Sequence, residues 1–306
     1  MARRRFAKAV IGRVSVAFAR VLAMLSIGAS RRIARALTPV LYHLLPRVRN
    51  TGMANLDLAY GDTLSDGEKR RILRGSIENM LIVAFELFQI PKLEGAFLER
   101  NIRVKGTEFI PGESGCVAIG AHHGNWEWSA TAMARRGYKA CEIVREFDDP
   151  HLNAFIDGTR RSGGVITIPK DRAAREMMER LANGYMVGIL ADQNPRENAV
   201  PVTFFGHPCW ATIGPALAAA RARVPIIPFS ITRDPDDGYT LEFFPPIEMV
   251  NTGRTREDLV VNTQRCQDAL EAIVRRAPEQ WLWLHRRWKE RPHLEAEWKR
   301  RTGENR

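Results

Sequence analysis

The sequence predicts an α/β protein in which a mixed β-sheet is flanked by helices and preceded by basic amphipathic helices. From residue 101 onward, short β-branched and apolar runs alternate with helical stretches of 10–15 residues, which is typical of a layered domain with a largely parallel or mixed sheet. The chain has 306 residues, 45% hydrophobic and 26% charged, unlike a disordered, collagen-like or coiled-coil protein. A mean hydropathy of −0.27 excludes a polytopic membrane protein, which needs several apolar segments of about 20 residues.

The net charge is confined to the N-terminal segment. The 46 Lys and Arg exceed the 35 Asp and Glu by 11, and residues 1–50 contain eleven basic residues and no acidic one. The rest of the chain therefore has no net charge. A nucleic-acid-binding protein usually carries its basic surplus on the domain that contacts phosphate, so we expect no nucleic acid as partner. We expect residues 1–50 to be a basic membrane-anchoring segment and residues 51–306 to be a single domain.

Between residues 6 and 27, apolar side chains recur at steps of mostly three and four. They share one helix face, opposite the arginines at 13 and 20, and they are Ile11, Val14, Phe18, Val21, Leu22 and Leu25. This pattern is typical of a helix lying in the interface of an anionic membrane. One tilted span, with Arg20 near its middle at about 2.5–3.5 kcal/mol, and a helix packed on the body are the alternatives. The positive-inside rule places such an anchor on the cytoplasmic face of the inner membrane.

The body begins with a helix and continues as alternating strands and helices. Ser65, with Glu68 three residues later, indicates a helix start, and that helix is expected to run to about Gln89. The expected strands are Ile102–Val104, Cys116–Gly120, Cys141–Val144, Val165–Ile168, Val187–Leu190, Val202–Phe205, Pro225–Ile231 and Tyr239–Phe244. The expected helices lie at about 126–136, 150–162, 171–183, 212–223 and 255–276.

The four cysteines indicate neither a disulfide scaffold nor a zinc site. They are scattered, without a Cys-x-x-Cys pair or a histidine at ligand spacing, and they are Cys116, Cys141, Cys209 and Cys266. This usage fits a reducing compartment. We expect no metal in the protein.

The candidate site lies where an apolar strand ends, in Gly120-Ala121-His122-His123-Gly124-Asn125-Trp126-Glu127-Trp128. Asn125 is expected to cap a helix, and His122 to lie in the turn at the carboxyl end of the strand, where α/β folds bind ligands. If His122 folds back onto Glu127, the carboxylate fixes one imidazole nitrogen and the other accepts a proton from a hydroxyl. The alternative interpretation is a capping turn with a solvated histidine. His123 is expected to be structural.

Four blocks in this order resemble the lipid A late (secondary) acyltransferases. They are the His-x-Gly-Asn-Trp-Glu form of the H-x4-(D/E) motif at 122–127, Asp192-Gln193 after an apolar strand, Phe204-Phe205-Gly206, and Pro278–Lys289. The resemblance covers about residues 30–292 and implies that His122 and Glu127 are the catalytic pair. Arg145 and Arg160 match arginines recurrent in the family and could bind a phosphate or assist an oxyanion, with a solvated arginine as the alternative. Asp192 is expected to hold one of them or to cap a turn.

The resemblance also implies the reaction and the partners. It implies transfer of a fatty acyl chain from an acyl thioester, carried by acyl carrier protein or coenzyme A, to a hydroxyl of a lipid A precursor. It implies no metal or organic cofactor, and a fold like that of glycerol-3-phosphate acyltransferase. The same chemistry on a lysophospholipid or another glycolipid is the nearer alternative, and a non-catalytic peripheral membrane protein is the remote one. None of Ser114, Ser129 and Ser162 has the Gly-x-Ser-x-Gly setting of a nucleophile, which favours direct transfer.

Overall fold

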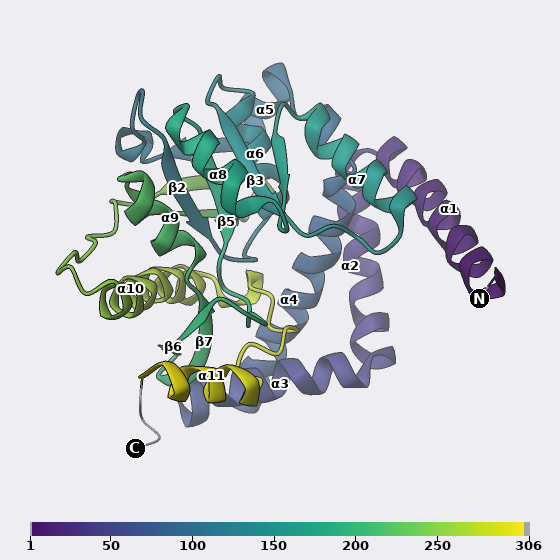
Figure 1. Cartoon of the computed structure of the whole chain (residues 1–306). Coiled ribbons are helices and arrows are strands. Elements are labelled where there is room, and N and C mark those ends of the chain that lie inside the picture. Colours follow the sequence, from purple (N-terminus) through teal and green to yellow (C-terminus); the bar gives the residue numbers. More distant parts are fainter. Residues whose placement is uncertain (1, 303–306) are drawn as a thin grey trace.

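The structure is a computed structural model that describes residues 2–302, with the backbone alone for residues 2–11, 13, 301 and 302. The α-helices are α1 (Ala2–Met24), α2 (Ile27–Leu44), α3 (Pro46–Tyr60), α4 (Asp66–Leu87), α5 (Gly95–Asn101), α6 (Trp126–Ala134), α7 (Pro150–Ser162), α8 (Ala173–Ala182), α9 (Gly214–Ala222), α10 (Thr255–Arg276) and α11 (Pro292–Thr302) (Figure 1). The strands are β1 (Ile102–Lys105), β2 (Cys116–Gly120), β3 (Ala140–Val144), β4 (Ile166–Pro169), β5 (Met186–Leu190), β6 (Ala199–Phe204), β7 (His207–Thr212), β8 (Ile226–Arg233) and β9 (Tyr239–Phe243). Short 3-10 turns lie at Gly61–Thr63, Ile90–Lys92, Thr107–Phe109 and Pro278–Gln280.

Seven strands form one mixed sheet in the order β1-β9-β8-β2-β5-β3-β4. All strands from β8 to β4 pair in parallel, β9 is antiparallel to β8, and β1 is parallel to β9. The prediction of a mixed sheet flanked by helices is confirmed. In this order β2 and β5 are central neighbours, so their carboxyl ends lie side by side at one edge of the sheet.

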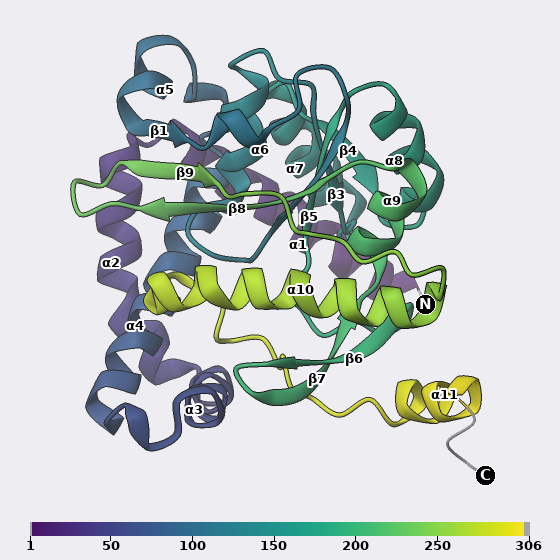
Figure 2. The same ribbon diagram turned by 90° about the vertical axis from the view of Figure 1, so that its left-hand side faces the viewer.

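Helices cover both faces of the sheet because side chains on a strand alternate between its faces. On β2, Val117 and Ile119 pack in the cluster that includes buried residues of α8, α9 and α10. Cys116 and Ala118 pack in the cluster that includes buried residues of α6. Figure 2 shows α10 running along one face of the sheet. The fully buried pattern of β2 explains its continuous apolar sequence.

The strand β7 was not predicted from the sequence. It pairs with β6 in a separate antiparallel hairpin whose register brings Phe204 opposite His207. The two residues between them, Phe205 and Gly206, both have positive φ values, 51° and 73°. This is the backbone of a tight two-residue hairpin turn. A phenylalanine in that position is uncommon, and Pro208 weakened the strand signal that follows.

The first two helices pack on the rest of the molecule, α2 along α4 and α1 along α7 (Figure 1). Nine of the eleven exposed large apolar side chains identified in the described part of the chain lie on or beside these helices; they are Val14, Phe18, Val21, Met24, Ile33, Leu37, Val40, Leu44 and Leu45. The side chains of residues 11 and 13, one from each face of the predicted amphipathic helix, lie outside the described residues. In the described part of the chain, every helix falls short of the combined length and apolar content that crossing a bilayer requires.

Candidate active site

A sharp turn joins β2 to α6 and presents His122. It comprises residues 121–125 and is called the His122 turn below. Gly124 has a φ of +58°, and a Cβ there would lie 1.5 Å from a backbone carbonyl oxygen of β8, so only glycine fits. The side chain of Asn125 accepts a hydrogen bond from the backbone N–H of Trp128 at 3.2 Å, which caps α6 as the sequence predicts.

The carboxylate of Asp192 orients the imidazole of His122. Asp192 follows β5 and is buried, so it faces His122 across the edge formed by the carboxyl ends of β5 and β2. One of its oxygens lies 2.8 Å from His122 Nδ1, and the other accepts the backbone N–H of His122 at 2.9 Å. The indole N–H of Trp281 donates to the same carboxylate at 2.8 Å. A carboxylate on Nδ1 places the proton there and leaves Nε2 as a proton acceptor.

This contact shifts the pKa values of both groups. Burial alone would raise the pKa of Asp192, but the charge of His122 and the hydrogen bonds lower it to about 2. Burial alone would lower the pKa of His122, but Asp192 and, to a smaller extent, Glu127 raise it above its usual value. Asp192 is therefore ionised at neutral pH and stabilises the imidazolium form of His122.

Glu127 has a different partner from the one expected from the sequence. Between the described side chains of Glu127 and His122 no hydrogen bond forms. Instead the two oxygens of Glu127, in the first turn of α6, accept from Nε and Nη2 of Arg160 at 2.9 and 2.8 Å. The indole N–H of Trp126 donates to Glu127 at 3.2 Å. Nδ1 of His122 is already occupied by Asp192, so Glu127 reaches it only through its charge.

The expected partners of the two carboxylates are thus exchanged. We expected Asp192 to hold an arginine or to cap a turn, but it holds His122, and Arg160 pairs with Glu127. Arg160 also lies 3.5 Å from Glu142 on β3, where burial and then Glu127 raise the pKa of Glu142 to about 7. Arg145 follows β3 directly and is exposed.

The second ring nitrogen of His122, Nε2, faces a side chain that the sequence analysis did not single out as a site residue. Nε2 of Gln193 lies 3.3 Å from Nε2 of His122, at the place from which a substrate hydroxyl would donate. The His122 side chain is 20% exposed, so the imidazole is partly accessible from outside. The ring of Trp126 lies edge-on to the imidazole, with centroids 5.1 Å apart.

The C-terminal motif, residues 278–289, forms backbone hydrogen bonds with the His122 turn. Trp281 pairs with His123 in a short antiparallel bridge, and the N–H of Leu282 donates to the carbonyl of His122 at 3.1 Å. Trp281 and Trp283 are 2% and 0% exposed, so they pack in the core. His123 is structural, as expected: it is buried, its Nε2 lies 3.0 Å from a backbone carbonyl, and burial lowers its pKa to about 4.

The chemistry that this arrangement allows is that of a general base. An imidazole with Asp192 on one nitrogen can remove a proton from a hydroxyl with the other. All four cysteines are buried, and burial raises the pKa of Cys116, in the strand that leads to His122, to about 12. A thiol in this state is a poor nucleophile, because the thiolate is the reactive form.

Comparison with known proteins connects this geometry with a family. The model of the bacterial lipid A biosynthesis acyltransferases matches residues 3–290. The chain belongs to this family. The resemblance found in the sequence is confirmed, and the protein is an acyltransferase.

Relatives of this acyltransferase include enzymes named for two different lipids. A lipid A biosynthesis acyltransferase of Haemophilus influenzae is 25% identical over 82% of this chain and 81% of its own. A lipid A biosynthesis lauroyltransferase of Escherichia coli is 25% identical over 78% of each chain. A phosphatidylinositol mannoside acyltransferase of Mycobacterium tuberculosis is 24% identical over 66% of each chain.

Proposed function

We propose that this acyltransferase moves a fatty acyl chain from an acyl thioester to a hydroxyl of a lipid A precursor, with His122 as the general base. The observation that supports this most directly is the 2.8 Å contact between Asp192 and Nδ1 of His122. In the neutral imidazole this contact places the proton on Nδ1, so that Nε2, at the carboxyl edge of the sheet, can accept one. Acyl carrier protein is the proposed donor, with acyl-coenzyme A as the alternative.

The proposed reaction is a direct transfer. Nε2 of His122 takes the proton of the acceptor hydroxyl as its oxygen attacks the thioester carbonyl. The new C–O bond forms a tetrahedral intermediate, and the C–S bond then breaks. The leaving sulfur takes the proton from the imidazolium and departs as a thiol, which returns His122 to its neutral form. Asp192 stabilises the imidazolium during this cycle. Gln193 must move from Nε2 before the hydroxyl binds there.

Glu127 and Arg160 are proposed to support this step without touching the transferred proton. Their ion pair is 11% and 13% exposed, and the charge of Glu127 helps to raise the pKa of His122. Arg145, exposed after β3, is proposed to contact the phosphate of a substrate, since a guanidinium binds phosphate through paired N–H donors.

A second acceptor class is favoured by one of the relatives. The mycobacterial protein is named for a phosphatidylinositol mannoside, so a glycolipid other than lipid A, or a lysophospholipid, is the alternative acceptor. The His122–Asp192 geometry serves any primary or secondary hydroxyl, and it does not distinguish these lipids.

We further propose that the protein works on the cytoplasmic face of the inner membrane. The exposed apolar side chains gather on α1 and α2, and Arg20 and Arg32 are exposed on the same helices. An apolar face with flanking cations binds an anionic bilayer surface. A lipid acceptor then reaches the site without leaving the membrane.

The test is a lipid profile by mass spectrometry of a strain lacking this gene, complemented with the wild type or with His122→Ala. We expect one lipid class to lose a single acyl chain, the wild type to restore it, and His122→Ala to restore nothing while accumulating as a folded protein. An unchanged profile in the deletion strain, or full restoration by His122→Ala, would contradict the proposed function. The identity of the deacylated lipid separates lipid A from the other acceptors.

A further inference from the structure

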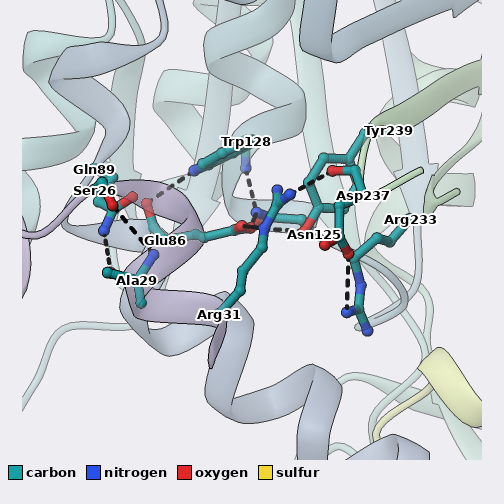
Figure 3. Close-up of polar contacts among 12 residues, drawn as sticks. Ser26, Ala29, Arg31, Glu86, Gln89, Asn125, Trp128, Arg233, Asp237 and Tyr239 are labelled. Carbon is teal, nitrogen blue, oxygen red and sulfur yellow. Dashed lines mark hydrogen bonds and ion pairs between the residues drawn. The ribbon is translucent and has the colours of Figure 1, made fainter. Parts of the chain in front are cut away.

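A buried carboxylate that the proposed chemistry does not use lies behind the His122 turn. Glu86 on α4 is 0% exposed. Its oxygens accept from Nε of Arg31 at 2.5 Å, from Nδ2 of Asn125 at 2.6 Å and from the hydroxyl of Tyr239 at 2.6 Å (Figure 3). Burying a charge is costly unless donors satisfy it. Here three donors do so, from α2, the His122 turn and β9.

Asn125 is the residue through which Glu86 reaches the site. Its amide uses both ends: Oδ1 accepts the N–H of Trp128, and Nδ2 donates to Glu86. Burial raises the pKa of Glu86 above its usual value, although Arg31 and Tyr239 act in the opposite direction. With three donors around it, the group accepts hydrogen bonds, so it determines which way the Asn125 amide points. The indole N–H of Trp128 also donates to the backbone carbonyl of Glu86 at 2.9 Å. Glu86 therefore holds the end of the His122 turn together with the first turn of α6, which carries Glu127.

Arg31 holds the opposite side of the Glu86 carboxylate. Its Nη1 donates to the backbone carbonyl of Asp237 at 2.5 Å, and its guanidinium lies 5.4 Å from the ring centroid of Tyr239. Burial alone would lower the pKa of Arg31, but the charge of Glu86 raises it above its usual value. The N-terminal helix α2 thus supplies the counter-charge for a carboxylate that contacts the His122 turn.

We propose that Glu86 is a positioning residue for acyl transfer: through Asn125 it keeps the His122 turn in the geometry that places His122 on Asp192, with Arg31 as its counter-charge. The part that concerns acyl transfer rests on the proposed function. The part that concerns the geometry of His122 is measurable without turnover.

The variant Glu86→Gln tests the proposal. It replaces a carboxylate with an amide that keeps one acceptor oxygen. Because the charged Arg31 holds that oxygen, the new NH2 group faces Nδ2 of Asn125, so the Asn125 amide must rotate and the cap on α6 is lost. We expect kcat to fall about 10- to 100-fold, the scale of a small misplacement of a reacting group, and KM for donor and acceptor to change less than about threefold. We also expect the pKa of His122, measured by NMR titration of the imidazole, to fall as the ring loosens from Asp192.

Two further variants distinguish positioning from packing. In the double variant Glu86→Gln/Asn125→Asp, the new carboxylate accepts from the new amide and from Trp128, so we expect most of kcat and the pKa of His122 to be restored. Asn125→Asp alone places two buried carboxylates against each other, so we expect its kcat and Tm to be lower than those of the wild type. Tyr239→Phe is the matched control: it removes a donor from the same carboxylate but leaves the Asn125 contact, so Tm should fall while kcat stays within about twofold.

If Glu86→Gln fails to fold, Asn125→Ser takes its place. Serine still caps α6 through its oxygen but is shorter and lacks the amide NH2 group that contacts Glu86, so the same fall in kcat and in the pKa of His122 is expected. Three results would overturn the proposal. They are a wild-type kcat and His122 pKa in Glu86→Gln or Asn125→Ser, the same loss of kcat in Tyr239→Phe, and no restoration in the double variant. If the wild type transfers no acyl chain but Glu86→Gln still lowers the pKa of His122, the proposed function fails and the positioning stands.

Discussion

Two carboxylates affect His122, one by direct hydrogen bonds and the other by its charge alone. Asp192 makes direct hydrogen bonds to it, whereas Glu127 acts through its charge while bound to Arg160. A direct contact fixes the tautomer and the orientation of the ring, and a more distant charge only shifts the proton affinity. Removing either carboxylate should therefore lower the pKa of His122, but removing Asp192 should reduce the rate of acyl transfer more than removing Glu127.

The first prediction concerns the pH dependence of Asp192→Asn. His122 acts as a base only when neutral, so in the wild type kcat/KM should fall as the pH drops through the raised pKa of His122. Asp192→Asn removes the charge that raises this pKa, so the fall should move to lower pH. It also removes the fixed tautomer, so the plateau of kcat/KM should drop by about 10²–10⁴. The measurement is a profile of kcat/KM against pH.

Glu127→Gln is the matched comparison for this profile. Glu127→Gln should also move the fall of kcat/KM to lower pH, but by less than Asp192→Asn does. It should lower the plateau of kcat/KM less than Asp192→Asn does. An unshifted profile in Asp192→Asn, or a larger loss in Glu127→Gln, would show that Glu127 rather than Asp192 governs His122.

The second prediction concerns the cysteines. Burial raises the pKa values of Cys116, Cys141 and Cys266 to about 12, and Cys209 is also buried with a raised pKa. A variant with all four changed to alanine should retain kcat apart from losses in stability, which are measured by thermal unfolding. Intact-mass analysis after incubation with an acyl donor should find no acylated enzyme. A trapped acyl thioester on Cys116 would rule out direct transfer.

At the scale of elements, the turn between β2 and α6 depends on one glycine, which gives the third prediction. A Cβ at Gly124 would overlap the carbonyl oxygen of Ile231, and β8 cannot move away without breaking its pairing with β2. We expect Gly124→Ala to displace the turn, lower Tm sharply and abolish acyl transfer. Thermal unfolding and kcat measure these effects.

Gly206, in the β6–β7 hairpin, is the control for backbone strain alone. It has a φ of +73° and no atom within 4 Å of the position of a Cβ. Gly206→Ala should therefore cost only the left-handed conformation, about 1–2 kcal/mol, and keep activity. Equal losses of Tm in the two variants would mean that the close approach of Gly124 to β8 does not contribute to the destabilisation.

The same elements show what the sequence could and could not predict. The strand at Cys116–Gly120, the turn after it and the cap at Asn125 follow from local patterns, and all were predicted. The partner of His122 was not, because it depends on β5 lying next to β2, and strand order is not a local property. Asp192 was singled out as a site residue, but chain spacing favoured the nearer Glu127 as the histidine's partner.

At the scale of the whole molecule, the N-terminal helices belong to the folded body as well as to the proposed membrane surface. The inner face of α2 contains the buried Arg31, which pairs with Glu86, and the outer face exposes Leu37 and Leu44. Removing residues 1–50 would leave Glu86 buried without its counter-charge, and such a loss is strongly destabilising. Membrane binding is therefore better tested with substitutions in the full chain than by truncation.

The last prediction is that exchanging outer-face residues of these helices reduces membrane binding without unfolding the protein. Phe18, Leu37 and Leu44 are 57%, 38% and 69% exposed, so changing all three to glutamine should leave Tm nearly unchanged. Each buried apolar side chain contributes about 1.5–3 kcal/mol, and each nearby cation about 1 kcal/mol on an anionic surface. Binding to anionic vesicles, measured by co-sedimentation, should fall at least tenfold, and binding to neutral vesicles should be weak for both proteins.

Salt and a control variant test the two contributions separately. High salt should release the wild type only in part, because it screens the cations but not the apolar contact, and it should release the triple variant fully. The control is Phe147→Gln with Val261→Gln, two exposed apolar residues outside α1 and α2, and it should bind like the wild type. If the triple variant binds vesicles as tightly as the wild type, or the control loses binding equally, then α1 and α2 are not the surface that contacts the membrane.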